Sequence, residues 1–204
     1  MSEPRAVAES VQEVVPGVWH WAISDERIGG YVSSAHAVGG SGGVVLVDPL
    51  PLATDALVGL GDVTAICLTT SSHQRSAWRL RRELGVRVWA PAASKEVDEE
   101  PDERYSEGDG MPAGLRPIFT PGAGTTQHSL LLDSEGGVLF TPDLFVRPSD
   151  QPLAMIPAEY AHDPEQARET AEKLLDLDFA VLCTGHGAPV TDDPKSAIRA
   201  ALAG

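Results

Sequence analysis

The pattern of apolar and polar positions divides the first half of the chain into strands followed by alternating helices and strands. β-branched and aromatic residues with glycine punctuation predict strands at the start, and from Pro51 the period lengthens toward that of a helix. The predicted strands are 14–23, 29–38, 42–48, 63–69 and 86–90, and the predicted helices are 51–60 and 73–85. This order indicates a strand meander that continues into a β-α-β-α-β run.

The second half of the chain repeats the same plan. Short predicted strands separated by glycine-rich turns cover residues 115–120, 128–133, 137–141 and 179–187. Asp163 and Pro164 form an N-cap and N1 pair that predicts a helix with an apolar stripe, and another Asp-Pro pair opens a last helix within residues 192–204. The pattern shows no fixed short repeat and no linker, so we expect one domain over 1–204 with two strand-rich layers flanked by helices.

Composition and charge exclude several classes of partner. The 30 acidic and 15 basic residues give a formal charge of −15, and such a surface repels nucleic acid. The acidic, turn-rich segment 96–110 is typical of a solvated loop. Apolar runs fall well short of the roughly 20 residues that span a bilayer, and the N-terminus lacks an apolar signal-peptide core, so we expect a cytoplasmic protein that does not insert into membranes.

Polar side chains follow several apolar strands at the point where each strand ends. Asp48, Asp143 and His186 occupy such positions, and the stretch LTTSSHQR at 68–75 follows another strand. In layered α/β proteins, ligands bind in the crevice beyond the carboxyl ends of strands. Cys67 and Cys183, by contrast, lie inside apolar strands, where a thiol is most often a small buried hydrophobe.

The order of these polar positions resembles that of the metallo-β-lactamase superfamily, which includes lactamases, glyoxalase-type thioesterases and related hydrolases. Asp48 matches the family's strand-ending Asp, and residues 69–75 fall on its T-H-x-H-x-D-H signature. Residues 121–124 match a P-G-H-T turn, Asp143 matches a later G-D turn, and residues 185–187 match a final G-H-G. The resemblance implies an α/β (α+β) fold, a four-layer αβ/βα sandwich with its site along one edge.

The same resemblance implies a cleft whose usual metal ligands are largely absent. The implied cleft-lining residues are Asp48, Thr70, Ser72, Gln74, Arg75, Ala123, Asp143 and His186. Family members hold one or two metal ions, commonly zinc, yet Thr70, Ser72, Gln74, Arg75 and Ala123 stand at five ligand positions. Hydroxyl and amide groups are poor zinc ligands, and a guanidinium repels a cation. We therefore expect no metal or other cofactor, and we expect Arg75 to pair with Asp143.

Two alternatives to a site without metal or activity stay open. His73, Asp143 and His186 would supply three ligands for one zinc, iron or manganese ion if the loop turned His73 inward. Ser72 or Ser71, with His186 and Asp143, contains the residue types of a metal-free nucleophile, base and orienting group. The candidate catalytic residues are Asp143, His186, His73 and Ser72.

The favoured functional hypothesis is a pseudoenzyme that binds a small molecule or a protein partner, without hydrolysing it, in the cleft where family members hold their metal ions. Trp19, Trp21 and Tyr31 would flank that cleft or else pack in the core. The alternative is an unusual hydrolase acting on an ester, thioester or lactone, with one rewired metal or without metal. The sequence leaves open enzymatic activity, the substrate and the oligomeric state, including assembly as a homo-oligomer.

Overall fold

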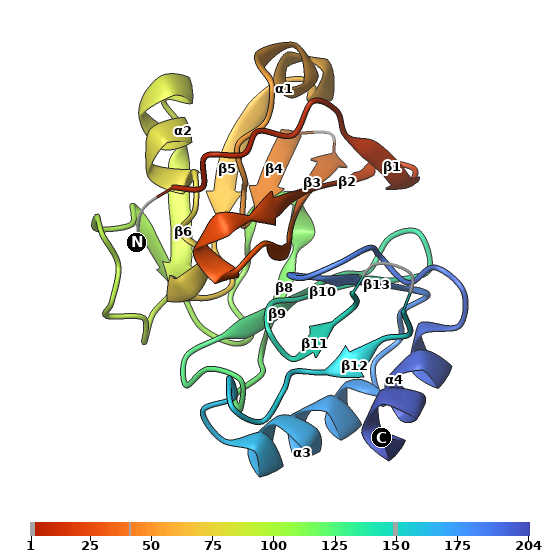
Figure 1. Cartoon of the computed structure of the whole chain (residues 1–204). Coiled ribbons are helices and arrows are strands. Elements are labelled where there is room, and N and C mark those ends of the chain that lie inside the picture. The colour runs from red at the N-terminus through yellow and green to blue at the C-terminus, as the bar shows by residue number, and fades with distance from the viewer. Residues whose placement is uncertain (1–2, 41, 149–150) are drawn as a thin grey trace.

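Two β-sheets pack against each other at the centre of the computed structural model, which describes residues 3–40, 42–148 and 151–204 (Figure 1). In the seven-stranded sheet the spatial order follows the sequence, antiparallel from β1 to β4 and parallel from β4 to β7. Its strands are β1 Gln12–Val15, β2 Val18–Asp25, β3 Tyr31–Gly40, β4 Gly43–Val47, β5 Val63–Cys67, β6 Arg87–Pro91 and β7 Glu103–Tyr105.

The second sheet has four strands in the order β13-β10-β9-β8, and a separate two-stranded ribbon pairs β11 with β12. These strands are β8 Arg116–Phe119, β9 His128–Leu132, β10 Val138–Thr141, β11 Phe145–Val146, β12 Ala154–Met155 and β13 Val181–Thr184. The helices are α1 Thr54–Leu60, α2 Ala77–Leu84, α3 Pro164–Leu174 and α4 Pro194–Ala203, with 3₁₀ turns at η1 Glu26–Ile28, η2 Ser71–His73 and η3 Pro112–Gly114.

The helices cover the outer faces of both sheets, α1 and α2 on one side and α3 and α4 on the other (Figure 1). The strand β4 shows how the sequence produces these layers. Val44 and Leu46 face the cluster beneath α1 and α2, whereas Val45 and Val47 face the second sheet. A strand buried on both faces needs apolar residues at consecutive positions, as this strand has. The four-layer αβ/βα sandwich expected from the sequence is therefore confirmed.

The two Asp-Pro helix starts form as predicted. Asp163 accepts a hydrogen bond from the backbone N–H of Gln166, and Asp193 accepts one from Ser196. Proline follows each cap, where its missing N–H costs nothing. No helix in the described parts of the chain has the length and apolar character needed to cross a bilayer.

The acidic segment 96–110 differs from the expected solvated loop. It contains β7, which pairs in parallel with β6 and buries Tyr105, whose hydroxyl donates to the carbonyl of Leu68 at 2.7 Å. Four of its acidic side chains are paired with arginines: Arg81 with Asp102, Arg82 with Glu99, Arg87 with Glu103, and Arg104 with Glu100. Most of the segment is exposed, as expected, and the expectation of a loop fails only at β7, where ion pairs with arginine neutralise the acidic side chains of a sheet edge.

Candidate functional site

A polar cluster lies at one edge of the two sheets, where four strands end. Asp48 follows β4, the loop 69–75 follows β5, Asp143 follows β10 and His186 follows β13. The strands β4 and β5 are parallel neighbours, as are β10 and β13, so their carboxyl ends meet at the same edge. The fold thus brings together residues that lie far apart in the sequence, at the place where α/β proteins bind ligands.

His73 faces the inside of this cluster. The sequence pattern predicts a helix from residue 73, which would place His73 away from the cleft, but α2 begins only at Ala77. His73 instead closes the 3₁₀ turn η2, and the left-handed backbone of Arg75 (φ 41°) separates that turn from α2. The side chain of His73 is therefore buried, and the expectation of an outward histidine is wrong.

The imidazole of His73 bridges two carboxylates. Its Nδ1 lies 2.9 Å from Oδ2 of Asp48, and its Nε2 lies 3.0 Å from Oδ1 of Asp143. Asp48 is itself held by the backbone N–H of Thr69 at 2.8 Å and by the Thr69 hydroxyl. Asp48 therefore orients His73, a role that sequence reasoning missed. Val47 pairs in parallel with Cys67, so Asp48 and the loop after β5 lie at the same edge of the sheet. Parallel pairing of these two predicted strands would therefore have predicted a contact between Asp48 and this loop.

His186 reaches the same oxygen of Asp143 from the other side. Its Nε2 lies 3.1 Å from Oδ1 of Asp143, and its Nδ1 lies 2.9 Å from the carbonyl oxygen of Val32 in β3. A carbonyl can only accept, so Nδ1 of His186 carries a proton; Nε2 then donates to Asp143 when it carries a second proton, and it offers its lone pair to a metal ion when it does not. The backbone of Val32 thus selects the tautomer of His186, which no sequence pattern reveals.

The convergence of these atoms requires positive charge between them. With both Nδ1 atoms donating, neutral His73 and His186 present two Nε2 lone pairs to a carboxylate oxygen at hydrogen-bonding distance. Such an arrangement is repulsive unless protons or a metal ion lie between the acceptors. His73, Asp143 and His186 each offer one ligand atom, and these atoms lie within 4.8 Å of one another.

The pKa values of the cluster reflect the same mutual attraction. Burial and the charge of Arg75 act to lower the pKa of His73, but the carboxylates of Asp143 and Asp48 outweigh them and raise it. Burial acts to raise the pKa of Asp143, whereas His73 and His186 hold it well below its ordinary range. The carboxylate of Asp143 is therefore ionised, as a metal ligand must be.

Ser72 approaches Asp143 and not a histidine. Its Oγ donates to Oδ2 of Asp143 at 3.3 Å and lies 3.2 Å from Oγ1 of Thr70. Among the described residues, the hydrogen-bonding contacts of this hydroxyl include no imidazole nitrogen. A serine nucleophile needs an adjacent base, commonly histidine, and the contacts of Ser72 therefore do not support the metal-free alternative for this residue.

Arg75 does not pair with Asp143, and that expectation is wrong. Its buried guanidinium donates instead to the backbone carbonyls of Ser34, Asp48 and Gly185. Three carbonyl dipoles stabilise the charge of Arg75, while Asp143 has Nε2 of His73, and not a guanidinium, at hydrogen-bonding distance. Burial lowers the pKa of Arg75, but a guanidinium stays protonated in a protein.

Gln74 and Ala123 contribute nothing to the cluster. The amide of Gln74 is buried among structural partners: it donates to the carbonyls of Ser71 and Glu96 and accepts from Trp78 and the backbone of Asp98. Ala123 packs against the hydrophobic cluster beneath α3 and α4. The recorded hydrogen bonds of Gln74 and Arg75 thus go to other partners than the side chains of His73, Asp143 and His186.

The aromatic residues of the first strands differ in burial. Trp21 is buried beneath α1 and α2, where its Nε1 donates to the carbonyl of Leu50, and Trp19 packs partly buried against the same cluster. Tyr31 is exposed at the start of β3. Cys67 and Cys183 are buried, and desolvation raises the pKa of both thiols, which agrees with their expected role as small hydrophobes.

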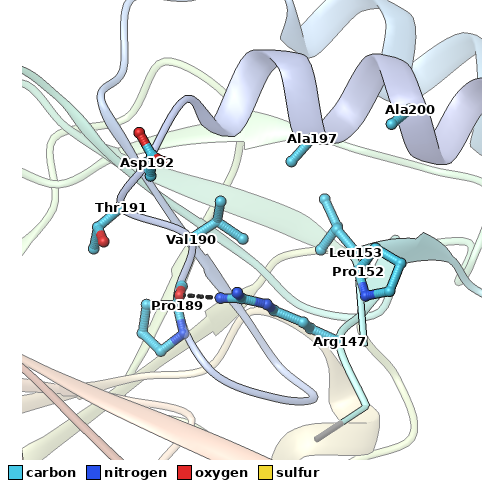
Figure 2. A pocket seen from close by; sticks show the side chains of 9 residues that line it. All are labelled: Arg147, Pro152, Leu153, Pro189, Val190, Thr191, Asp192, Ala197 and Ala200. Atoms are coloured by element: carbon cyan, nitrogen blue, oxygen red, sulfur yellow. Dashed lines mark hydrogen bonds between the residues drawn. The ribbon is translucent and has the colours of Figure 1, made fainter. Parts of the chain in front are cut away.

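A separate pocket of about 280 Å³ lies beside α4 and the segment 189–192 that leads into it (Figure 2). It is lined by Arg147, Pro152, Leu153, Pro189, Val190, Thr191, Asp192, Ala197 and Ala200. The guanidinium of Arg147 donates to the carbonyl of Pro189 at 2.5 Å, while its backbone N–H donates to the carbonyl of His186. The pocket and the polar cluster thus share one turn but no lining side chain.

Comparison with known proteins identifies the fold and the family. The family model described as the metallo-beta-lactamase superfamily matches residues 14–202. No curated protein matches the sequence significantly.

Several solved structures are similar to this chain. TMB-1 matches with a TM-score of 0.75 at 15% identity, over 97% of this chain and 98% of its own. The DIM-1 metallo-β-lactamase matches with the same TM-score at 16% identity, over 96% and 98% of the two chains. A metallo-β-lactamase family protein from Thermus thermophilus matches at 0.67 and 18% identity, over 93% and 79%. At these identities the likeness shows the fold alone.

Proposed function

The chain belongs to the metallo-β-lactamase superfamily, and we propose that it is a member whose two-metal centre has been replaced by a single metal site formed by His73, Asp143 and His186. The observation that supports this proposal is the inward position of His73, with Nε2 3.0 Å from Asp143 and Nδ1 held by Asp48. The sequence alone favours a pseudoenzyme. The inward position of His73 supports instead the alternative, a hydrolase with a single metal.

The donor set suits a first-row divalent metal. Two imidazoles and one carboxylate are the protein ligands of many catalytic zinc sites and of non-haem iron sites. Each histidine also has the partner at Nδ1 that metal-ligating histidines need, a carboxylate for His73 and a backbone carbonyl for His186. The Ser72 hydroxyl occupies Oδ2 of Asp143, which leaves Oδ1 to face the two imidazoles.

A metal in this position would supply a Lewis acid and an activated water for hydrolysis of an ester, thioester or lactone. The chain's own contribution is orientation. Asp48 holds the ring of His73, Val32 holds the ring of His186, and the buried cluster keeps both Nε2 atoms unprotonated when the metal is bound. The hydroxyls of Thr70 and Ser72 stand where family members have imidazoles; they lie 3.2 Å from each other, and Ser72 supports the metal ligand Asp143 through a hydrogen bond.

The second candidate is the pseudoenzyme. It is favoured by the contacts of Arg75 and Gln74, which use backbone and structural partners at two of the family's ligand positions. In this case His73 is an imidazolium that donates from Nδ1 to Asp48 and from Nε2 to Asp143, and the cleft binds a small molecule or a protein partner without hydrolysis.

Metal content separates the two candidates without knowledge of a substrate. Protein purified without chelator or histidine tag is analysed for zinc, iron and manganese, alongside His73→Ala, Asp143→Ala and His186→Ala. His162→Ala, which changes a histidine outside the cluster, is the matched control. We expect about one metal per chain in the wild type and the control, and less than a tenth of that in the three variants.

Substoichiometric metal in the wild type, with no rise in melting temperature on adding any of the three ions, would contradict the proposal and support the pseudoenzyme. If metal is bound, a panel of chromogenic esters, thioesters and lactones tests hydrolysis, with His73→Ala as the inactive reference.

A further inference from the structure

Arg75 makes an unusual set of contacts for a buried charge. The residue is 4% exposed, and its Nη1 donates to the carbonyls of Ser34 and, at 3.1 Å, Asp48. Its Nη2 donates to the carbonyl of Gly185 at 3.3 Å. These carbonyls belong to β3, to the end of β4 and to the turn after β13, so one side chain joins three separate segments.

Each of the three segments carries or supports a part of the candidate metal site. Asp48 orients His73 through its carboxylate, while its backbone carbonyl accepts from Arg75. Gly185 directly precedes His186. Ser34 reinforces the same turn, because its backbone N–H donates to Gly185 at 2.8 Å and its hydroxyl donates to the carbonyl of Gly187 at 2.8 Å. His186 is thus held on both sides.

The chemistry of the contacts requires arginine. A guanidinium is planar, carries five N–H donors in a fixed fork and can reach several carbonyls at once, whereas the ammonium of lysine is a single point. The backbone of Arg75 is left-handed at φ 41°, a conformation that costs a non-glycine residue about 1 kcal/mol or more. Such a conformation persists only where the surrounding contacts define the position.

We propose that Arg75 is a positioning residue, which places His186 relative to the His73–Asp48 pair by joining the carbonyls of Asp48, Ser34 and Gly185. The proposal rests on the proposed metal site, because the two imidazoles that Arg75 positions would bind the same ion. It goes beyond that site because it gives a role to the guanidinium of Arg75, which stands where family members have a metal ligand.

The test compares Arg75→Lys, which keeps the charge but loses the fork, with Arg147→Lys. Arg147 is the matched control because its guanidinium also donates to backbone carbonyls, those of Ala188 and, as Figure 2 shows, Pro189, which follow the same turn in the sequence. Two readouts are made on each full-length variant. Imidazole ¹⁵N NMR of the chelator-treated protein, assigned with His186→Gln, reports the tautomer of His186, and cobalt titration followed by visible absorption reports metal affinity and geometry.

We expect Arg75→Lys to lose the single Nδ1–H tautomer of His186, to bind cobalt at least 10-fold more weakly and to change the shape of the cobalt spectrum. Arg147→Lys should keep the tautomer, the affinity and the spectrum within error. A purely structural role of Arg75 would lower the melting temperature of Arg75→Lys without changing the tautomer or the spectrum.

Unchanged tautomer and unchanged cobalt spectrum in Arg75→Lys would overturn the proposal. If the wild type binds no cobalt, the proposed function fails, and the tautomer of His186 alone decides whether Arg75 positions it. If Arg75→Lys does not fold, Arg75→Gln, which keeps an N–H donor without the charge, is measured by the same two methods.

Discussion

The Nε2 atom of His73 lies 3.0 Å from Oδ1 of Asp143, and this contact joins the loop after β5 to the turn after β10. It therefore links the strand ends of the two sheets. It also places His73, which occupies a variable position of the family signature, within the candidate site. The geometry of the site depends on this contact and on the residues that maintain it.

Asp48→Asn should weaken metal binding without removing a ligand. The substitution replaces the carboxylate that fixes Nδ1 of His73, and loss of such a partner typically costs about 10–100-fold in metal affinity. Competition with a chromogenic chelator measures the change. Asp25→Asn is the control, since Asp25 is equally buried but bonds Arg27 and Ser33 in the β2–β3 hairpin. Equal affinities for the two variants would argue against an orienting role for Asp48.

Gly185→Ala should disturb the site sterically. A Cβ at this position would lie 2.5 Å from the carbonyl oxygen of Pro142 and 2.7 Å from Cε1 of His73. Relief of such overlap typically costs about 1–3 kcal/mol of stability, and it must move either His73 or the turn before Asp143. The free energy of unfolding in urea and the metal affinity should both fall.

Gly59→Ala provides the comparison for this substitution. Gly59 lies within α1 with nothing within 4 Å of an added Cβ, and alanine there should stabilise the protein by about 0.5–1 kcal/mol. If Gly185→Ala were as stable as Gly59→Ala and bound metal normally, the close packing of His73 against this turn would be disproved.

The fold and part of the site could be predicted from the sequence. The apolar run of β4 and the caps at Asp163 and Asp193 are local signals, and local signals placed these elements correctly. Asp143 and His186 could be placed because each follows an apolar strand. β7 was missed because the burial of Tyr105 depends on a distant carbonyl and on arginine partners.

The orientation of His73 could not be predicted for a similar reason. The residues after 73 have a good helical pattern, but helix formation from that point loses to long-range contacts: the carboxylates of Asp48 and Asp143 on His73, and the carbonyls on Arg75. The left-handed backbone at Arg75 is the local result. Helical propensity is a weak prior that tertiary contacts override.

His20 should make the protein less stable in mild acid. His20 and His36 are buried neighbours whose ring centroids lie 5.3 Å apart, and their Nε2 atoms have no hydrogen-bond partner among the described residues. Burial lowers the pKa of His20 to about 4, so the unfolded state takes up a proton first as the pH falls. The stability that neutral His20 provides is complete above pH 6.5 and is lost toward pH 4, by about 2 kcal/mol between about pH 7.5 and pH 5.

His20→Leu isolates this effect in chelator-treated protein, because the raised pKa of His73 acts in the opposite direction in both proteins. Urea unfolding at about pH 7.5 and pH 5 should show that the stability of His20→Leu relative to wild type rises by about 2 kcal/mol on acidification. His162→Leu, which changes a histidine outside this pair, should show no such change. A pH-independent difference for His20→Leu would refute the buried, neutral state of His20.

The central claim, one metal held by His73, Asp143 and His186, is tested most directly by a crystal structure of zinc-soaked protein with diffraction data collected on both sides of the zinc absorption edge. We expect one anomalous peak at about 2.0–2.2 Å from Nε2 of His73, a carboxylate oxygen of Asp143 and Nε2 of His186. We also expect no peak beside Thr70. The absence of a peak at the cluster, with both imidazoles bonded directly to Asp143, would contradict the claim, as would two adjacent peaks.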